Sequence, residues 1–534
     1  MNTSALGPQE CFRVHSKDLL GRVGTLTTKS GEFQTPHMFP VVDPNRIPLG
    51  QKFFNEIGIH AIMTNAYLHR RARAQRPREN VHDTLQFKET VATDSGAYQI
   101  LQYGGVEVTP QEIVQYQEEV DTDIGVILDI PTGFRSNAAR SEWTVSETVK
   151  RADEALRVRK RDDILWVGPV QGGVHIEQVR RSAREMAKRN FSIHALGSPT
   201  ELMESQRFEV LVDMIVAAKR ELPPNRPLHL FGAGHPAMFG FFVALGCDLF
   251  DSAAYALYAR SDRYLTAEGT VELFDMEEFP CSCSACSGRT PSEVRKLAVP
   301  ERVDLLSTHN LQACFSELRG VREAIRRGRL WDLLETRAHT HPALKRCLDR
   351  IASYSVDLER STPVVKPHGI FYFGPVSNNR PELQGYKARL ARVPISAGST
   401  VLLLPGRWRR PYRADPLYRP LVSQFEDERS VQIVFYTLPF GPVPSELDET
   451  YPVAQTEGLD TGDSDEHLAK AQMVMDHVKR LKPKMTVLVV QGDYGRAVLA
   501  EARRILPKAR VKSVDGEKTE VETIAKMFGK LIVA

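Results

Sequence analysis

The chain has 534 residues, of which 26% are charged and 42% are hydrophobic, and its formal net charge is +3. This length predicts roughly three domains, because it exceeds what one ordinary core holds. The composition is typical of a globular protein, no apolar run approaches the ~20 residues that span a bilayer, and the N-terminus lacks signal-peptide architecture. These properties exclude a membrane-spanning protein and favour a cytoplasmic one.

Along residues 1–354 short apolar runs alternate with amphipathic segments. The runs predicted to be strands are 60–66, 90–94, 124–130, 164–173, 191–197, 227–234 and 247–253. Helical spacing of apolar residues marks 146–161 and 176–190. Continuously apolar strands that alternate with helices indicate a buried parallel sheet. No GxGxxG motif follows an early strand, so we expect a (β/α)8 TIM-type barrel of the α/β class rather than a doubly wound nucleotide-binding sheet.

Polar residues end several of these strands. They are Asp94, Asp129, Gln171, His235 and Asp251. Any one of them alone is more simply explained as a strand-end cap. Three carboxylates at the same mouth of a barrel would repel one another, which is costly unless function compensates. Tyr98, four residues after Asp94, is suited to stack on a flat ligand.

Three cysteines and a histidine follow the last predicted strand. Cys281, Cys283 and Cys286 lie within six residues, and His309 follows after 22 more. This spacing is typical of a metal site rather than a disulfide framework. Three sulfurs and one imidazole complete a tetrahedral zinc shell and leave no position for water. We therefore expect one structural Zn²⁺ in a subdomain at about 275–315, inserted in the catalytic domain.

Beyond residue 354 the chain changes character. A proline-rich transition opens a segment predicted to be an α+β accessory domain at 355–445, and a second accessory α/β domain is expected at 446–534. Two arginine clusters stand out along the chain. They are Arg70, Arg71, Arg73, Arg76 and Arg78, and Arg407, Arg409, Arg410 and Arg413. A solvated surface explains either one alone, but tyrosines and prolines interleave with the second, which favours phosphate contact.

The strand-end carboxylates suit displacement at a sugar carbon. One carboxylate can attack C1′ while a second manages the protons of the leaving base. Asp129 can accept hydrogen bonds from the N–H groups of a purine-like base, and Gln171 supplies both a donor and an acceptor.

Several motifs in the same order resemble the tRNA-guanine transglycosylases. DSGAYQ, VQGG, LFD and the CxCxxC…HN set carry this resemblance, and LDIPTG, HALGSP, HLFGAGHP and DLFDSAAYALYAR are similar to its archaeal branch. The resemblance covers about residues 10–350. It implies a glycosyltransferase that replaces guanine at position 15 of tRNA with 7-cyano-7-deazaguanine (preQ0), in archaeosine biosynthesis.

The resemblance also assigns roles to residues. Asp251 is expected to be the covalent nucleophile and Asp94 the general acid/base, while Asp129 and Gln171 recognise the edges of the base. Gly172 and the backbone around His194 and Ala195 are expected to complete the base pocket, and Tyr98 is expected to stack on the base. The implied partners are tRNA, guanine and preQ0, and a second copy of the chain in a homodimer formed near the zinc subdomain.

Two alternatives remain open. An archaeosine synthase-type paralogue shares the fold, but its PC…KPY…S…H pattern is not found here. A noncatalytic tRNA-binding subunit tends to lose a carboxylate, whereas Asp94 and Asp251 are both present. The resemblance further predicts a C-terminal PUA domain. Its glycine-rich strands are not evident in 484–534, so we expect a separate PUA-domain protein, with greater use of the basic 407–413 region as the alternative.

Overall fold

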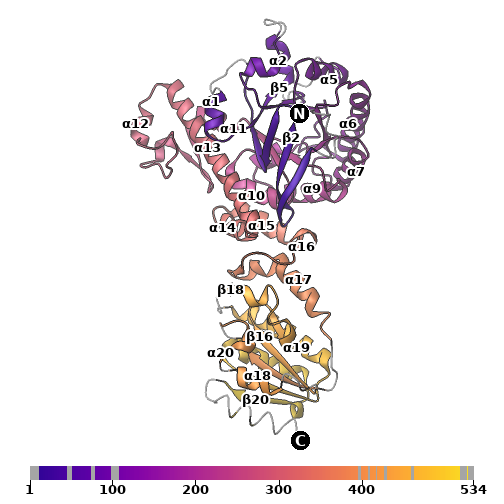
Figure 1. Ribbon diagram of the computed structural model, residues 1–534, viewed down its shortest axis with the longest axis vertical. Coiled ribbons are helices and arrows are strands. Elements are labelled where there is room, and N and C mark those ends of the chain that lie inside the picture. Colours follow the sequence, from indigo (N-terminus) through magenta and orange to yellow (C-terminus); the bar gives the residue numbers. More distant parts are fainter. Residues whose placement is uncertain are drawn as a thin grey trace, which may run out of the picture. The chain divides into compact units, whose positions relative to one another are not determined.

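A computed structural model of the chain divides into two compact units, residues 1–351 and 352–534 (Figure 1). The residues that it describes are 11–44, 51–73, 79–97, 108–394, 399–406, 409–416, 418–425, 428, 430–458, 462–516, 523 and 526. The predicted division at 354/355 falls three residues from the observed one. No helix in the described part of the chain is long and apolar enough to cross a bilayer.

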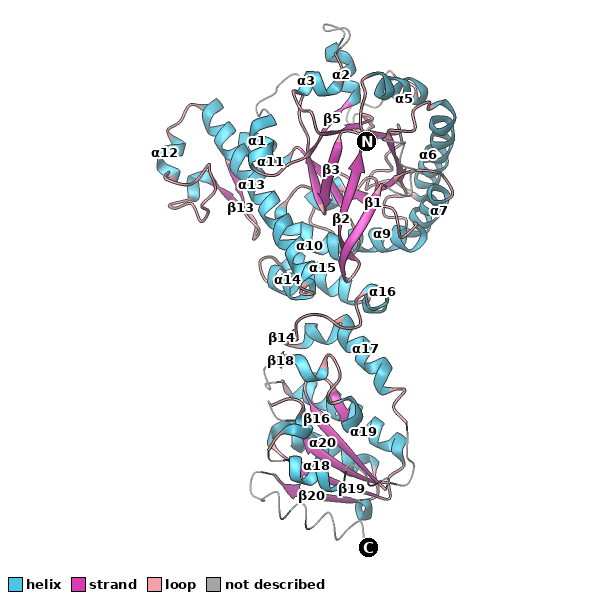
Figure 2. Cartoon of the chain, viewed as in Figure 1, coloured by secondary structure: helices cyan, strands magenta, loops and turns pink. Residues whose placement is uncertain are grey.

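The first unit is built around an eight-stranded parallel barrel. Its strands are β4 (His37–Pro40), β5 (Ala61–Asn65), β6 (Thr90–Asp94), β7 (Ile124–Val126), β8 (Leu165–Val170), β9 (Ile193–Leu196), β10 (Leu228–Leu230) and β11 (Leu249–Ser252). From β5 to β11 each strand pairs with the next, and β11 pairs with β4. A parallel bridge between Val41 and Met63 brings β4 beside β5, so the sheet is nearly closed. The predicted α/β barrel is confirmed, and helices surround its strands (Figure 2).

The seven predicted strands supply β5 to β11, and the eighth strand was not predicted. It is β4, a four-residue strand in a segment too short to show periodicity. The N-terminal antiparallel sheet of β1 (Phe12–Asp18), β2 (Gly21–Thr28) and β3 (Gly31–Thr35) was also missed. Both belong to the first forty residues, where β2 and β4 show little alternation because they are largely buried on both faces, although β1 does alternate.

Helices follow the strands around the barrel. They are α1 (Gln51–Glu56), α2 (Ala66–Arg73), α3 (Val81–Leu85), α5 (Pro110–Glu119), α6 (Ala138–Val158), α7 (Ile176–Ala187), α8 (Thr200–Glu204), α9 (Phe208–Glu221), α10 (Pro236–Ala244) and α11 (Ala254–Arg260). The helix predicted at 146–161 begins earlier, because the Asn137 side chain caps it by accepting from the Arg140 amide at 2.8 Å.

The barrel interior is filled by alternate residues of its strands. Ala61 and Met63 of β5, Ala92 of β6 and Leu249 of β11 belong to one buried apolar cluster. Cys11, Leu26 and Phe33 from the N-terminal sheet belong to the same cluster, so this sheet closes one end of the barrel. Since side chains alternate along a strand, the next inward positions are Asn65, Asp94 and Asp251. Apolar filling therefore gives way to polar groups at the carboxyl ends of the strands.

After the barrel strands the chain forms a small subdomain and returns along a long helix. The elements are β12 (Arg263–Leu265), β13 (Thr270–Glu272), η1 (Leu273–Asp275), α12 (Pro291–Arg295) and α13 (Val299–Arg326), followed by α14 (Leu330–Ala338), α15 (Pro342–Ala352) and α16 (Ser355–Ser361). The subdomain has its own apolar cluster, which includes Tyr264, Leu273 and Cys286. The helix α13 joins this cluster to the barrel, because it also contacts the barrel strand β4.

The second unit holds a five-stranded sheet of order β17-β16-β15-β19-β20. Its strands are β15 (Thr400–Pro405), β16 (Val431–Thr437), β17 (Gly441–Pro444), β19 (Met485–Val490) and β20 (Val511–Asp515), and β14 (Ile370–Tyr372) pairs with β18 (Thr456–Gly458) beside it. The main helices are α17 (Pro381–Leu390), α18 (Arg419–Phe425), α19 (Ser464–Leu481) and α20 (Gly492–Ile505). Because β15 pairs with β19, the segments predicted as separate domains at 355–445 and 446–534 share one sheet.

Candidate functional site

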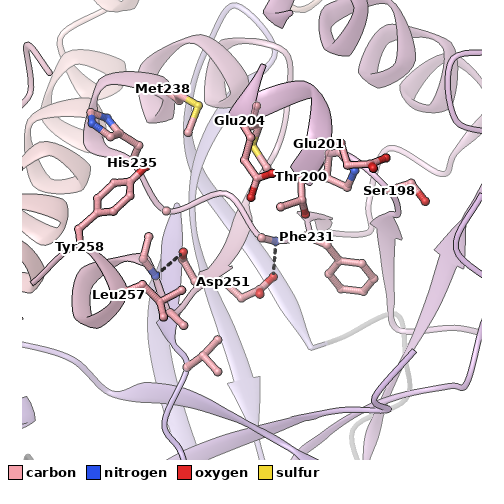
Figure 3. A pocket seen from close by; sticks show the side chains of 18 of the residues that line it. Ser198, Thr200, Glu201, Glu204, Phe231, His235, Met238, Asp251, Leu257 and Tyr258 are labelled. Atoms are coloured by element: carbon pink, nitrogen blue, oxygen red, sulfur yellow. Dashed lines mark hydrogen bonds between the residues drawn. The ribbon is translucent and has the colours of Figure 1, made fainter. Parts of the chain in front are cut away.

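A cavity of about 1040 Å³ opens at the carboxyl ends of the barrel strands. It is lined by polar residues at or just after the ends of six strands. Those residues include Asn65, Asp94, Asp129, Gln171, Ser198 and Asp251. Figure 3 shows Asp251 between the loop that carries Phe231 and the helix α11 that carries Leu257. The structure thus brings the four principal predicted residues, Asp94, Asp129, Gln171 and Asp251, to one cavity.

Asp251 is held by two donors from the neighbouring strand and loop. The Gly232 amide donates to its Oδ1 at 3.0 Å, and the His229 Nε2 lies 2.8 Å from the same oxygen. Gly232 has a φ of +70°, a conformation that glycine adopts without strain. The Asp251 side chain keeps 16% of its surface exposed, whereas that of His229 keeps 2%. Asp251 therefore faces the cavity from a fixed position.

Asp94 has a different environment. Asn65 Nδ2 donates to its Oδ2 at 3.1 Å, across the β5–β6 pair. Burial, together with the charges of Asp251 and Asp129, raises the pKa of Asp94 to about 7, and the backbone N–H groups of Gly96 and Ser95 only partly oppose this. Asp94 consequently holds a proton near neutral pH and can give it up or take it back, as a general acid/base requires.

Asp129 and Gln171 form a hydrogen-bonded pair. Gln171 Nε2 donates to Asp129 Oδ2 at 2.5 Å. The Gln171 Oε1 accepts from the Thr132 amide at 3.1 Å and from the Ser198 hydroxyl at 2.9 Å, which fixes the orientation of the amide. Burial raises the pKa of Asp129 to about 6, against the lowering effect of the Gln171 hydrogen bond. The pair presents an oriented polar edge to the cavity.

Gly197 allows this pair to form. A Cβ atom at position 197 would lie 2.1 Å from Gln171 Nε2, so any larger residue would displace the amide. Gly172, predicted to contribute to the pocket, instead packs on helix α7, where an added Cβ would meet the Val179 amide at 2.5 Å. Its amide donates to Thr132 Oγ1 at 3.0 Å. Gly172 therefore shapes the loop without lining the cavity.

The side chains of His194 and Ala195 also do not line the cavity, and a contribution of their backbone to a base pocket stays a prediction. Ala195 belongs to the apolar cluster inside the barrel, and the alternation of side chains along β9 directs His194 to the opposite face. Burial, with Arg226 and Lys219, lowers the pKa of His194 to about 4. Gly197 and Ser198, the residues just beyond the strand, line the cavity in their place. Tyr98 lies outside the described residues.

Three site residues were not predicted from sequence. Asn65 supports Asp94, His229 supports Asp251, and Ser198 orients Gln171. Asn65 carried a usable signal, because it ends an apolar strand as Asp94 does. His229 stands two residues before Phe231 in PLHLFG, so the sequence places both side chains on the same face of a strand. The sequence does not show that this face meets Asp251, because that contact depends on the pairing of β10 with β11.

The predicted metal ligands are brought together in the subdomain. The ligand atoms of Cys281, Cys283, Cys286 and His309 all lie within 4.8 Å of one another, so the cluster could hold a metal ion. His309 Nδ1 is 3.4 Å from the sulfurs of Cys283 and Cys286. His309 Nε2 lies 2.9 Å from the Leu265 carbonyl oxygen and donates to it, which leaves Nδ1 unprotonated for a metal. The ring of Tyr264 stacks on the imidazole at a centroid distance of 3.5 Å.

The second arginine cluster is largely engaged within its own unit. Arg410 donates to the Thr456 carbonyl and lies over the Tyr412 ring. Arg413 donates to the Ser445 carbonyl at 2.8 Å. The tyrosines and prolines that interleave with these arginines thus build a folded corner, and phosphate contact by this cluster stays a prediction. Arg407 lies outside the described residues.

Comparison with known proteins gives two family matches. Residues 17–343 match the model for "Queuine tRNA-ribosyltransferase", and residues 383–531 match a domain of unknown function (DUF5591). The second match covers residues on both sides of the division predicted at 445/446, as does the five-stranded sheet of the second unit.

Relatives named "tRNA-guanine(15) transglycosylase" align with most of the chain. The protein of Pyrobaculum aerophilum is 40% identical over 84% of this chain and 90% of its own length. That of Sulfolobus acidocaldarius is 37% identical over 93% of this chain and 96% of its own. That of Methanococcus maripaludis strain C7 is 37% identical over 85% of this chain and 70% of its own. The chain therefore belongs to the tRNA-guanine transglycosylase family of tRNA-ribosyltransferases.

Proposed function

We propose that this enzyme is a tRNA-guanine(15) transglycosylase that exchanges guanine 15 of tRNA for preQ0, through a covalent ribosyl-aspartate intermediate, in archaeosine biosynthesis. The observation that carries this proposal is the convergence of Asp94, Asp129 and Asp251 on one cavity, with different hydrogen-bond environments. The names of the relatives supply the position of the exchanged base.

In the first half of the exchange, the Asp251 carboxylate attacks C1′ of the ribose. The C1′–N9 bond of guanine breaks, its electron pair passes to N9, and Asp94 supplies the proton that neutralises the departing base. The raised pKa of Asp94 supports this role, because the carboxyl group is still protonated close to neutral pH. The product is an ester between Asp251 and the ribose, with guanine free to leave.

In the second half, the incoming base loses its N9 proton to the Asp94 carboxylate and attacks C1′. The ester bond breaks and its electron pair returns to Asp251. One glycosidic bond replaces another, so the exchange is nearly isoenergetic and requires no ATP. Asp129 and Gln171 recognise the edge of the base, since they offer acceptor and donor groups held in one orientation.

The cysteine and histidine cluster is proposed to bind one Zn²⁺. Thiolates of Cys281, Cys283 and Cys286 with the Nδ1 of His309 form the Cys₃His donor set that zinc prefers, and the closed shell makes the metal structural. It would brace β12 and α13 next to the cavity, which Arg263 and Thr270 of the same subdomain help to line.

Base exchange provides the test. Unmodified tRNA incubated with radiolabelled guanine should gain label at position 15, and Asp251→Asn should abolish both the labelling and a denaturation-stable enzyme–tRNA adduct. Labelling confined to an anticodon position, or an adduct that persists in Asp251→Asn, would overturn the proposal. An archaeosine synthase-type paralogue or a noncatalytic subunit would incorporate no guanine. A homodimer and a separate PUA-domain protein stay predictions.

A further inference from the structure

His229 is a buried polar residue for which the chemistry described above has no use. It lies on β10 with an exposure of 1%, and its ring contacts Phe39 at a centroid distance of 5.6 Å and Phe231 at 4.8 Å. Its Nε2 is 2.8 Å from Asp251 Oδ1. Because an ionised carboxylate can only accept hydrogen bonds, Nε2 carries the proton and donates it.

Both hydrogen bonds that reach Asp251 from the described residues end on the same oxygen. The Gly232 amide donates to Oδ1 at 3.0 Å, so Oδ1 receives one backbone and one imidazole donor. Both donors come from β10 and the turn after it, and β10 is paired in register with β11. Asp251 lines the cavity, and among the described residues no hydrogen bond to its other oxygen, Oδ2, is present.

We propose that His229 is a positioning residue that, together with the Gly232 amide, occupies Oδ1 of Asp251 and thereby selects Oδ2 as the oxygen that bonds to C1′. This inference rests on the proposed function, because it assumes that Asp251 is the nucleophile. His229 acts through Asp251 and touches neither the base nor the ribose.

The same two donors serve the second half of the exchange. While Oδ2 is esterified to C1′, Oδ1 is the ester carbonyl oxygen. When the incoming base attacks C1′, the electron pair of the C1′–Oδ2 bond returns to the carboxylate, and negative charge spreads back onto Oδ1. Two preorganised donors at Oδ1 stabilise this developing charge, in the manner of an oxyanion hole. His229 therefore favours formation of the leaving carboxylate as well as its orientation.

The variants His229→Phe and His229→Gln separate this role from packing. Phenylalanine fills the space between Phe39 and Phe231 but cannot donate, whereas the Gln Nε2 can reach the position of the imidazole Nε2. We expect His229→Phe to lower kcat for guanine exchange about 10–1,000-fold, with KM for tRNA and for the base within about twofold of wild type. His229→Gln should recover most of the lost kcat.

His37 provides the matched control. It is also a buried barrel histidine, 3% exposed, which packs against Phe39 and whose Nε2 lies 3.0 Å from a backbone oxygen, that of Ala61. His37→Phe should change the melting temperature as much as His229→Phe does, while kcat stays within about twofold. Thermal melting of each variant, measured alongside exchange, identifies any variant that fails to fold.

Asp251→Asn, assayed in parallel, distinguishes the two proposals. If Asp251→Asn still exchanges guanine, the proposed function fails, and the role of His229 fails with it. If Asp251→Asn is inactive while folded His229→Phe keeps the wild-type kcat, or if His229→Gln is no better than His229→Phe, the role of His229 is overturned and the proposed function stands.

Discussion

Asp94, Asp129 and Asp251 share a cavity yet differ in how each is hydrogen-bonded. Asp251 accepts hydrogen bonds from the Gly232 amide and from His229, whereas Asp94 accepts one from the Asn65 side chain and feels the charges of the other two carboxylates. Burial and like charge favour the protonated form of Asp94. Two oriented donors fix the position of the Asp251 carboxyl group. The roles proposed for Asp94 as acid/base and for Asp251 as nucleophile are consistent with these different surroundings.

The raised pKa of Asp94 predicts a pH-dependent cost to stability. The folded pKa of about 7 lies above the unfolded value of 3.8. The contribution of Asp94 to the free energy of unfolding is therefore fully present below about pH 4 and is lost as the pH rises through 7. Asp94→Asn should match wild type near pH 4 and exceed it at pH 8, by at most about 4 kcal/mol in the free energy of unfolding. Urea denaturation at the two pH values measures this difference.

Asp153 offers the control for this prediction. Its pKa is lowered by the Arg189 hydrogen bond, so Asp153→Asn should bring no gain at high pH. A stability difference between Asp94→Asn and wild type that is the same at pH 4 and pH 8 would contradict the assignment. Guanine exchange by Asp94→Asn should fall at least about 100-fold, as expected when a general acid/base is removed.

Gly197 makes a second prediction at the scale of one residue. In Gly197→Ala the new Cβ would lie 2.1 Å from Gln171 Nε2, which must then move away from Asp129. We expect KM for the base to rise about tenfold, as for the loss of one good hydrogen bond of about 1.4 kcal/mol. Gly320→Ala on α13 is the control, because nothing lies within 4 Å of its Cβ position. Equal KM values for the two variants would show that the Gln171 amide does not set base affinity.

At the scale of elements, a buried ion pair between Arg22 and Asp248 links the N-terminal sheet to the barrel. Arg22 of β2 donates to Asp248 through Nε at 3.0 Å and through Nη2 at 2.5 Å, and Asp248 also accepts from the Leu228 amide. The two side chains are 6% and 1% exposed. This bidentate pair specifies how β2 meets the strand β11, at the end of the barrel opposite the cavity.

Breaking this pair should be costly because it leaves a charge buried without its partner. Asp248→Asn is expected to lower the free energy of unfolding by about 3–5 kcal/mol. The exposed pair Arg161–Asp163, with side chains 33% and 39% exposed, gives the comparison: Asp163→Asn should cost less than about 1 kcal/mol. Chemical denaturation measures both, and similar losses for the two variants would contradict the role assigned to Arg22 and Asp248.

At the scale of the whole molecule, each unit encloses its own apolar cores. The barrel cluster and the subdomain cluster belong to residues 1–351, and two further clusters on the five-stranded sheet of the second unit belong to residues 352–534. Regions with separate cores can unfold separately.

We therefore expect two resolved transitions on heating or denaturation. Asp248→Asn should shift the transition of the first unit and leave the other in place, since Asp248 belongs to the barrel. Tryptophan fluorescence can follow the first unit, because Trp166 and Trp331 are buried within it. A single transition that Asp248→Asn shifts as a whole would show that the two units unfold together.

Much of the fold was predictable because its signals are local. Continuous apolar runs marked seven barrel strands. The spacing of three cysteines and one histidine along the sequence marked the four metal ligands. The strand β4 was missed because four residues are too few to show a periodicity. The division at 445/446 was predicted because the sequence does not show that strands on its two sides pair with each other in one sheet. The backbone around His194 and Ala195 was assigned to the pocket from a motif, but in this segment the residues that line the cavity begin at Gly197, directly after β9.

The sequence by itself determined the alternating strands and helices, the donor set for a metal and the carboxylates that end three strands, since these are properties of residue type and spacing. Only the tertiary structure decided that Asn65 meets Asp94, that His229 and Gly232 meet one oxygen of Asp251, and that Gly197 leaves room for Gln171. These contacts join residues 19 to 29 positions apart on different strands, and they depend on strand register and closure, which no local pattern encodes.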